Sequence, residues 1–319
     1  MKRFWVALIV VMLTALLALC DEKEKKPEKE PFPKDWSKEA LVPGESLTYS
    51  ISWKGIYAGK ATISIDTELA TFRKRSCYVM RSTTHSSDFI SNFYEVNDSV
   101  TTLLDKETLQ PLKFTKNIRE GSHRSYQLIY FYPDEKRIAY YKRKGDSYVL
   151  RKEFTDIQDK VQDVLSILIS IRMANLKEIG DKASVKVCTG KRVADVEFVV
   201  KSKKYIKVEA GEFLALHITV GFKAEKGVAE KLGEDEGLFV SDEIGEMWFD
   251  ALTRRPVLMT ASVPLGTVKV ELSQFKFPAP KNPRIEEKSP EEKKPEEKKT
   301  EGSGETQDKE KKEENKATP

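Results

Sequence analysis

The chain has very few of the residues on which enzymes most often depend for metal binding and nucleophilic catalysis. Its 319 residues include only three histidines and three cysteines. His85, His123 and His217 are far apart and lack the spacing of metal ligands. No Gly-x-Ser-x-Gly elbow, glycine-rich phosphate loop or nucleotide fingerprint is present. We therefore predict no catalytic residues, no metal and no cofactor, and a hydrolase is the least favoured function.

The chain also lacks a block of charge of one sign. It has 55 Lys and Arg against 51 Asp and Glu, which gives a net charge of only +4. In residues 281–319, short runs of glutamate and lysine nearly cancel each other. A nucleic-acid arm needs a basic block, so we expect no nucleic-acid partner. Residues 21–35 and 281–319 contain too little apolar surface to offset chain entropy, and both are predicted to be disordered.

Only one long apolar run is present, and it lies near the N-terminus. Lys2 and Arg3 precede the apolar residues 4–19, and Cys20 follows them. A basic start, an apolar middle and a small-residue end are typical of a secretory signal, here residues 1–20. We therefore expect an exported protein on the periplasmic side of a bacterial membrane. The sequence does not distinguish the inner from the outer membrane.

The end of this run, Leu17-Ala18-Leu19-Cys20, resembles the lipobox of bacterial lipoproteins, in which the cysteine is lipidated. Leu19 departs from that pattern, which prefers Gly, Ala or Ser at this position. The resemblance implies a lipid anchor on Cys20, and plain secretion or an uncleaved helix are the alternatives. The apolar run would extend about 24 Å as a helix, which is short for a bilayer core of about 30 Å.

If Cys20 carries lipid, Cys77 and Cys188 remain as an even pair in an oxidising compartment. Each lies in a strand-like run of residues. Two readings stay open: a disulfide that closes a long loop, or two buried thiols that behave as small apolar side chains.

Residues 36–280 are predicted to form one β-rich domain. Leu47, Tyr49, Ile51 and Trp53 alternate with polar residues, which is the period of a half-buried strand. Further strand-like stretches are residues 78–82, 93–104, 112–118, 125–132, 137–141, 148–154, 196–200, 205–208, 213–222, 247–249, 256–263 and 267–275. So many strands with few helices between them favour a strongly curved antiparallel sheet, as a barrel, half-barrel or sandwich.

One segment departs from the strand pattern. Residues 155–180 carry a wide apolar arc, a capping-box pattern at Thr155 and a terminal Gly180. They predict a single buried α-helix near residues 159–176 that packs against the sheet. Asp163 and Ser166 are placed on the opposite, less apolar face of this helix.

Arg172 falls within the apolar arc of that helix, where an unpaired guanidinium would be costly. One reading is an ion pair with Glu45, Asp98, Glu120 or another inward carboxylate. The other is that Arg172 faces a cavity and holds the acidic head group of an amphipathic ligand.

Aromatic residues are the other candidates for a binding site. We single out five of them, which could line a ligand pocket or belong to the core: Trp53, Tyr57, Phe93, Tyr130 and Trp248. The same two readings apply to Phe89, Tyr94, Tyr126, Phe131 and Phe249. The acidic, glycine-containing residues 225–243 are interpreted as a lid over the sheet or as a surface loop.

Several short motifs, in order, resemble the DUF3108 family of exported bacterial proteins of unknown function. They are Gly44-Glu45-Ser46-Leu47-Thr48-Tyr49, Trp53, Ala58-Gly59, Glu120-Gly121, Gln158-Asp159, Asp163-Val164-Leu165-Ser166, Arg172, Trp248, Arg255-Pro256-Val257 and Gly266. The resemblance extends over about residues 40–276. It implies a mostly β envelope protein and no established reaction.

These observations together favour an envelope lipoprotein without catalysis that binds an apolar or amphipathic ligand such as a lipid. The reasoning for the ligand is architectural, because curved sheets commonly house such molecules. The alternative is a structural or assembly factor that acts through contacts with other envelope proteins.

Overall fold

The computed structural model describes residues 39–222, 244–263 and 266–278. The expected signal segment with Cys20, linker 21–35, loop 225–243 and tail 281–319 lie outside the described residues, and the predictions about them remain predictions. The chain divides into two units, Met1–Pro278 and Ala279–Pro319, and the described residues all belong to the first.

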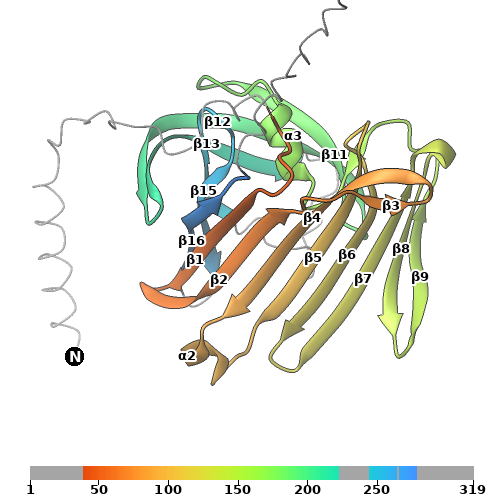
Figure 1. Cartoon of the computed structure of the whole chain (residues 1–319), viewed down its shortest axis with the longest axis horizontal. Helices are drawn as coiled ribbons and strands as arrows, with labels where there is room; N and C mark the ends of the chain where they lie inside the picture. The colour runs from red at the N-terminus through yellow and green to blue at the C-terminus, as the bar shows by residue number, and fades with distance from the viewer. Residues whose placement is uncertain (1–38, 223–243, 264–265, 279–319) are drawn as a thin grey trace, which may run out of the picture. The chain divides into compact units, whose positions relative to one another are not determined.

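Sixteen strands of the described residues form a single sheet (Figure 1). Their order across the sheet is β10 (Val161–Gln162), β11 (Lys182–Cys188), β12 (Val193–Val208), β13 (Gly211–Phe222), β14 (Ile244–Asp250), β15 (Pro256–Val263), β16 (Gly266–Lys276), β1 (Ser46–Trp53), β2 (Ile56–Ile65), β4 (Arg75–Ser86), β5 (Asn97–Asp105), β6 (Pro111–Glu120), β7 (His123–Tyr132), β8 (Arg137–Lys144) and β9 (Ser147–Phe154). The short β3 (Ala70–Phe72) pairs only with β4. Every pair is antiparallel except β10 with β11.

The sheet consists of two meanders that meet in its middle. Strands β1 to β9 form the first and β11 to β16 the second, and β16 returns to pair with β1 from Ser46↔Lys276 to Trp53↔Val268. The prediction of a mainly antiparallel β fold is confirmed. The sheet is not closed, because β9 and β10 are its two edges and are not paired with each other.

The core follows from the alternation of side chains along the strands. In β1, Leu47 and Tyr49 are fully buried while the flanking serine and threonine are partly exposed. In β12, Val196, Phe198 and Val200 are buried in the same alternating way. These side chains belong to one continuous hydrophobic cluster. One sheet can therefore bury a core because its two halves contribute to the same cluster.

The helix is shorter than the sequence predicted. Only α3 (Ile167–Met173) is α-helical, and the expected helix over 159–176 is wrong outside this segment. Asp156 has a positive φ of 59°, and Val161 and Gln162 pair with β11 as strand β10. Ala174 is extended and ends the helix. Most of α3 is nevertheless buried, and its four buried apolar residues join the common core cluster, whereas Met173 is exposed.

Two further short helical segments lie at strand connections. The helix α2 (Asp88–Ser91) follows β4, and the Ser87 hydroxyl accepts the Ile90 N–H at 3.3 Å. The 3-10 turn η2 (Pro133–Glu135) joins β7 to β8. Figure 1 shows α2 at the ends of β2 and β4. The turns β6–β7 and β8–β9 lie at the same end of the strands.

Gly59 allows β2 and β4 to approach each other beside α2. A Cβ atom at this position would lie 2.2 Å from the His85 carbonyl oxygen and 2.9 Å from the Ser86 Cα. Both contacts are with backbone, which cannot move aside as a flexible side chain would. Only glycine fits at this point of the strand pair.

We predict that Gly59→Ala destabilises the protein by about 1–3 kcal/mol, because the new methyl group forces β2 away from β4. The fall in thermal midpoint, measured by circular dichroism, checks this. Gly221→Ala in β13 is the matched control, since no heavy atom lies within 4 Å of its Cβ position. Equal midpoints for the two variants would contradict the packing argument.

Candidate functional site

Arg172 does not face an empty cavity. Its Nη2 lies 2.8 Å from Glu45 Oε1, and its Nη1 donates to the Ala40 carbonyl oxygen at 3.2 Å. Arg255 shares the same carboxylate, with Nε 2.8 Å from Glu45 Oε2 and Nη2 bonded to the same oxygen. The side chains of Glu45, Arg172 and Arg255 are 2%, 1% and 0% exposed. We call these three residues the buried charge cluster.

A second carboxylate, that of Asp250, offsets the net positive charge of the buried charge cluster. Asp250 attracts the Arg255 guanidinium, and burial raises the pKa of Asp250. Burial and the neighbouring Arg172 charge lower the pKa of Arg255, while Glu45 acts against them. Burial also raises the pKa of Tyr49, whose hydroxyl donates to the Pro256 carbonyl oxygen. The ion-pair reading of Arg172 therefore accounts for its burial, and the head-group reading does not.

Removal of the shared carboxylate should leave two buried guanidinium groups without their counter-charge. We predict that Glu45→Gln lowers the free energy of unfolding by about 3–5 kcal/mol, measured by chemical denaturation. Glu153→Gln is the control, because its ion pair with Arg137 is partly exposed and should be worth less than about 1 kcal/mol. If Glu45→Gln lowers the free energy of unfolding as little as Glu153→Gln does, the cluster does not stabilise the fold.

Asp163 and Ser166 form the true start of the helical segment. The Asp163 Oδ1 accepts the N–H groups of Leu165 and Ser166, both at 2.8 Å, and the Ser166 hydroxyl accepts the Asp163 N–H at 2.9 Å. This is a reciprocal capping arrangement. The Thr102 hydroxyl of β5 also donates to Asp163. Both residues are completely buried, so their expected position on the less apolar face is wrong.

Burial raises the pKa of Asp163 to about 6, although hydrogen bonds from Ser166, Leu165 and Thr102 act in the opposite direction. Its second oxygen, Oδ2, has no hydrogen-bond partner. The folded state therefore holds this proton more tightly than the unfolded state does. The contribution of Asp163 to stability is fully present below about pH 4 and is lost as the pH rises through 6.

We predict that the stability of the native chain relative to Asp163→Asn falls by roughly 2–3 kcal/mol between pH 4 and pH 7, because asparagine has no charge to bury. Urea denaturation across this pH range measures the difference. Asp181→Asn is the control with the opposite sign, since hydrogen bonds from the Glu178 and Lys177 N–H groups lower the pKa of Asp181. A stability difference between the native chain and Asp163→Asn that does not change with pH would contradict the prediction.

Cys77 and Cys188 are free, so the disulfide reading is wrong. Cys77 lies in β4 and Cys188 ends β11, and the strands β12 to β16, β1 and β2 separate them in the sheet. Burial raises the pKa of the Cys188 thiol to about 12 and also raises that of Cys77. Both thiols are therefore unreactive core residues.

The five aromatic candidates do not line one pocket. Trp248 is buried, and its ring stacks on His217 at a centroid distance of 4.9 Å. The Tyr130 ring stacks on Phe72 at 6.1 Å on another part of the sheet. Trp53 ends β1 beside Lys54, and Tyr57 and Phe93 are exposed near the same edge of the sheet.

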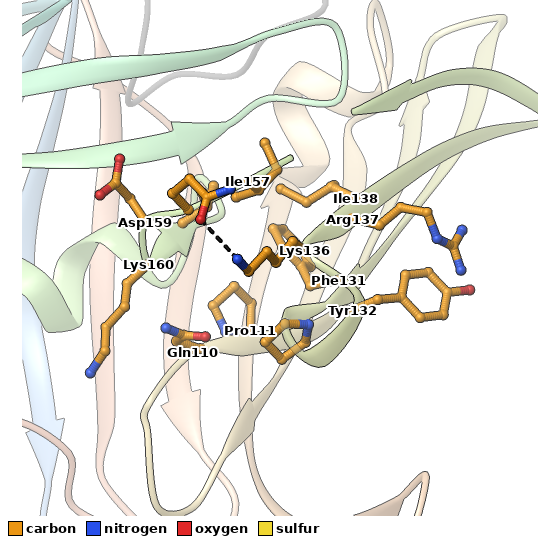
Figure 2. A pocket seen from close by; sticks show the side chains of 13 residues that line it. Gln110, Pro111, Phe131, Tyr132, Lys136, Arg137, Ile138, Ile157, Asp159 and Lys160 are labelled. Atoms are coloured by element: carbon orange, nitrogen blue, oxygen red, sulfur yellow. Dashed lines mark hydrogen bonds between the residues drawn. The ribbon is translucent and has the colours of Figure 1, made fainter. Parts of the chain in front are cut away.

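A small hollow of about 190 Å³ lies at the β7–β8 corner. Figure 2 shows the side chains that line it. The Lys136 ammonium donates to Gln158 Oε1 at 2.9 Å, and Arg137 is paired with Glu135 and Glu153. Asp159 faces Lys186 at 3.7 Å. The Gln158-Asp159 motif thus joins the chain after β9 to neighbouring strands, and the hollow offers little unpaired charge to a ligand.

A larger hollow of about 610 Å³ lies between β2, the end of β4 and α2. Its lining consists of Ile56, Tyr57, Lys60, His85, Ser86, Ser87, Asp88 and Phe89. We call it the α2 hollow. Three of its apolar side chains are exposed by half or more: Ile56 by 50%, Tyr57 by 53% and Phe89 by 58%. A contiguous patch of large, solvent-exposed apolar side chains is a common sign of a binding surface.

Phe93 extends this apolar surface beyond the α2 hollow. It is 78% exposed, and its ring meets Phe89 edge-on at 5.6 Å. Sequence reasoning named Tyr57, Phe89 and Phe93 as possible pocket residues but missed Ile56. Ile56 begins β2, and the strand pattern gives no signal that distinguishes this exposed isoleucine from a buried one.

A family model described as "Protein of unknown function (DUF3108)" matches residues 48–273. The chain belongs to this family. None of the curated proteins is a significant match. Among solved structures, a β-barrel-like protein of the domain of unknown function DUF1849 from Brucella abortus is similar, with 9% identity and a TM-score of 0.45, over 74% of this chain and 98% of that chain.

The description of the matched family names no reaction. In residues 39–222, 244–263 and 266–278, no group of three or more His, Cys, Asp or Glu could hold a metal ion. Over the same residues, no helix is long and apolar enough to cross a membrane.

Proposed function

We propose that this chain is a non-catalytic envelope protein, tethered to a membrane through Cys20, that binds an amphipathic molecule in the α2 hollow. The observation that carries the proposal is the gathering of Ile56, Tyr57 and Phe89, all at least half exposed, around one hollow of about 610 Å³. Pockets of this size hold small organic ligands, and their walls are mostly apolar.

The polar lining of the hollow fits an acidic head group. Lys60 and His85 are directly opposite each other in the β2–β4 register, so their side chains lie on the same face. Ser86 and Ser87 are on the same lining, with hydroxyls bonded to Ser91 and to the Tyr57 carbonyl oxygen, and Asp88 is its one acidic residue. A carboxylate at this place would meet one ammonium and one imidazole, while the apolar tail would cover the rings of Tyr57 and Phe89.

The proposed site lies at the ends of the strands and outside the hydrophobic core. The apolar residues of α3 and the inward residues of the strands belong to one cluster of buried side chains. We infer that α3 fills the space that the sheet bends around, in place of a bound lipid. This moves the expected ligand from the core side of the sheet to its rim.

The alternative function, assembly with other envelope proteins, is supported by strand β9. It is an edge strand, and every residue except Phe154 is exposed, including Tyr148, Val149 and Leu150. Its outer backbone groups are not paired within the sheet. An exposed, partly apolar edge can accept a strand of another protein.

A fluorescent fatty acid with a dansyl group tests the ligand proposal on residues 39–278. We expect saturable binding, and we expect Tyr57→Ser and Phe89→Ser each to weaken it about tenfold, because each removes apolar surface from the hollow. Lys60→Gln should weaken the acid more than the matching alcohol. Tyr148→Ser, exposed on β9, is the control. Binding that none of the hollow variants changes would refute the site.

A further inference from the structure

We infer that the ends of the strands around α2 form a membrane-docking surface that rests on an anionic phospholipid bilayer. This inference relies on the proposed tether at Cys20, but it concerns a different contact from the binding of a ligand in the α2 hollow. We call this surface the docking edge. It consists of the β1–β2 turn, α2 with the loop that follows it, and the turns β6–β7 and β8–β9.

The strand register places these four connections along one edge. Trp53 pairs with Ile56 at the first turn, and Gly59 pairs with Ser86 just before α2. Glu120 pairs with His123, and Lys144 pairs with Ser147, at the other two turns. Because the strands between them are antiparallel neighbours, all four connections point to the same side of the sheet, as Figure 1 shows.

Apolar rings protrude from the docking edge. Phe93 is the most exposed large apolar residue of the described chain, and it contacts the exposed Phe89. With Ile56 and Tyr57, these residues form a solvent-exposed apolar patch. Burial of one phenylalanine in an apolar phase favours binding by about tenfold or more. Aromatic and aliphatic side chains of this kind insert at the boundary between head groups and acyl chains.

The loop that carries Phe93 is fixed in place. The Tyr94 ring covers Gly121, where a Cβ atom would lie 2.9 Å from the ring, and its hydroxyl is bonded to Glu120. The Gly121 N–H donates to the Glu95 carbonyl oxygen at 2.7 Å. The exposed rings are therefore presented by an anchored loop, and little conformational entropy is lost when they enter a membrane.

The flanks of the apolar patch carry cations suited to phospholipid head groups. Arg119 and Arg124 are exposed beside the β6–β7 turn, and Arg143 and Lys144 are exposed at the β8–β9 turn. Lysine and arginine next to inserted apolar groups reach outward to phosphate. Each cation near an anionic bilayer favours binding by about fivefold.

Acidic residues lie on the same edge. Asp88, Glu95 and Asp146 interrupt the cations, and Asp146 pairs with Arg143. The electrostatic attraction is therefore moderate, and the apolar rings carry most of the contact. This combination favours a bilayer over a nucleic acid or another strongly anionic polymer.

The tether is long enough for this orientation. The described chain begins near Ala40, which contacts Arg172 of α3, so it enters on the side of the sheet away from α2. Residues 21–38 can span at most about 60 Å, whereas the eight residues of β1 extend about 27 Å. A domain held at Cys20 can thus turn its docking edge toward the same membrane. A tether also raises the local concentration, so weak docking suffices.

Photo-crosslinking of the full chain tests the inference. The protein, with its N-terminal anchor, is reconstituted into vesicles of phosphatidylethanolamine and phosphatidylglycerol that contain a photoactivatable phosphatidylglycerol. We expect labelled peptides from residues 85–97, and we expect Phe93→Ser to reduce that labelling about three- to tenfold. Ile179→Ser, which alters a 65% exposed apolar residue outside the docking edge, is the matched control and should change nothing.

Labelling confined to other segments, or labelling of residues 85–97 that Phe93→Ser does not reduce, would overturn the inference. The same variants in the fatty-acid assay separate it from the proposed function, because Phe93 is not part of the hollow lining. A native chain whose residues 85–97 are not labelled, although it binds the fatty acid, refutes the docking edge alone. Intact, Phe93-dependent labelling without fatty-acid binding supports the docking edge and refutes only the ligand.

Discussion

The carboxylate of Glu45 is the contact on which the arrangement of this fold depends. It lies just before β1, and its two oxygens meet Arg172 of α3 and Arg255 of the β14–β15 turn. Arg255 is 210 residues away in sequence. An isolated buried guanidinium is so costly that each arginine must keep this partner. The three segments are therefore fixed together at the point where the two meanders join.

Neighbouring contacts strengthen the same junction. Arg254, adjacent to Arg255, donates to the Leu176 carbonyl oxygen just after α3, at 2.7 and 3.0 Å. The Asp250 carboxylate accepts the N–H and hydroxyl groups of Thr253 and so shapes the turn that directs both arginines inward. Polar groups thus hold the helix against the strands, whereas the apolar cluster supplies most of the favourable burial.

The sequence predicted the parts of the fold that depend on local pattern. Strand periodicity identified most of the sheet, and the apolar surroundings of Arg172 correctly indicated burial and a carboxylate partner, with Glu45 among those considered. Arg255 was missed as the second partner, because no local pattern shows that a residue after β14 returns to a position before β1. Such a contact depends on the β1–β16 pairing, which closes a long loop.

The helix and the site show a second limit of sequence reasoning. An apolar arc over residues 159–176 fits a buried strand, a turn and a short helix as well as one long helix. The buried cap of Asp163 decides where the helix begins, and its partner Thr102 comes from a distant strand. Likewise, the periodic pattern does not show which aromatic residues remain exposed. The exposure of Phe89 and Phe93 depends on a loop that ends against the β6–β7 turn.

The structure combines one continuous hydrophobic core with a separate group of exposed apolar side chains. The buried residues of α3 and of the strands form one core cluster, and Phe89 and Phe93 are not part of it. The contacts of Tyr94 with Glu120 and Gly121 hold the loop in place, so that these rings remain exposed to water. Burial of the rings elsewhere would favour the protein, so their fixed exposure leaves a contact that an external apolar phase can complete.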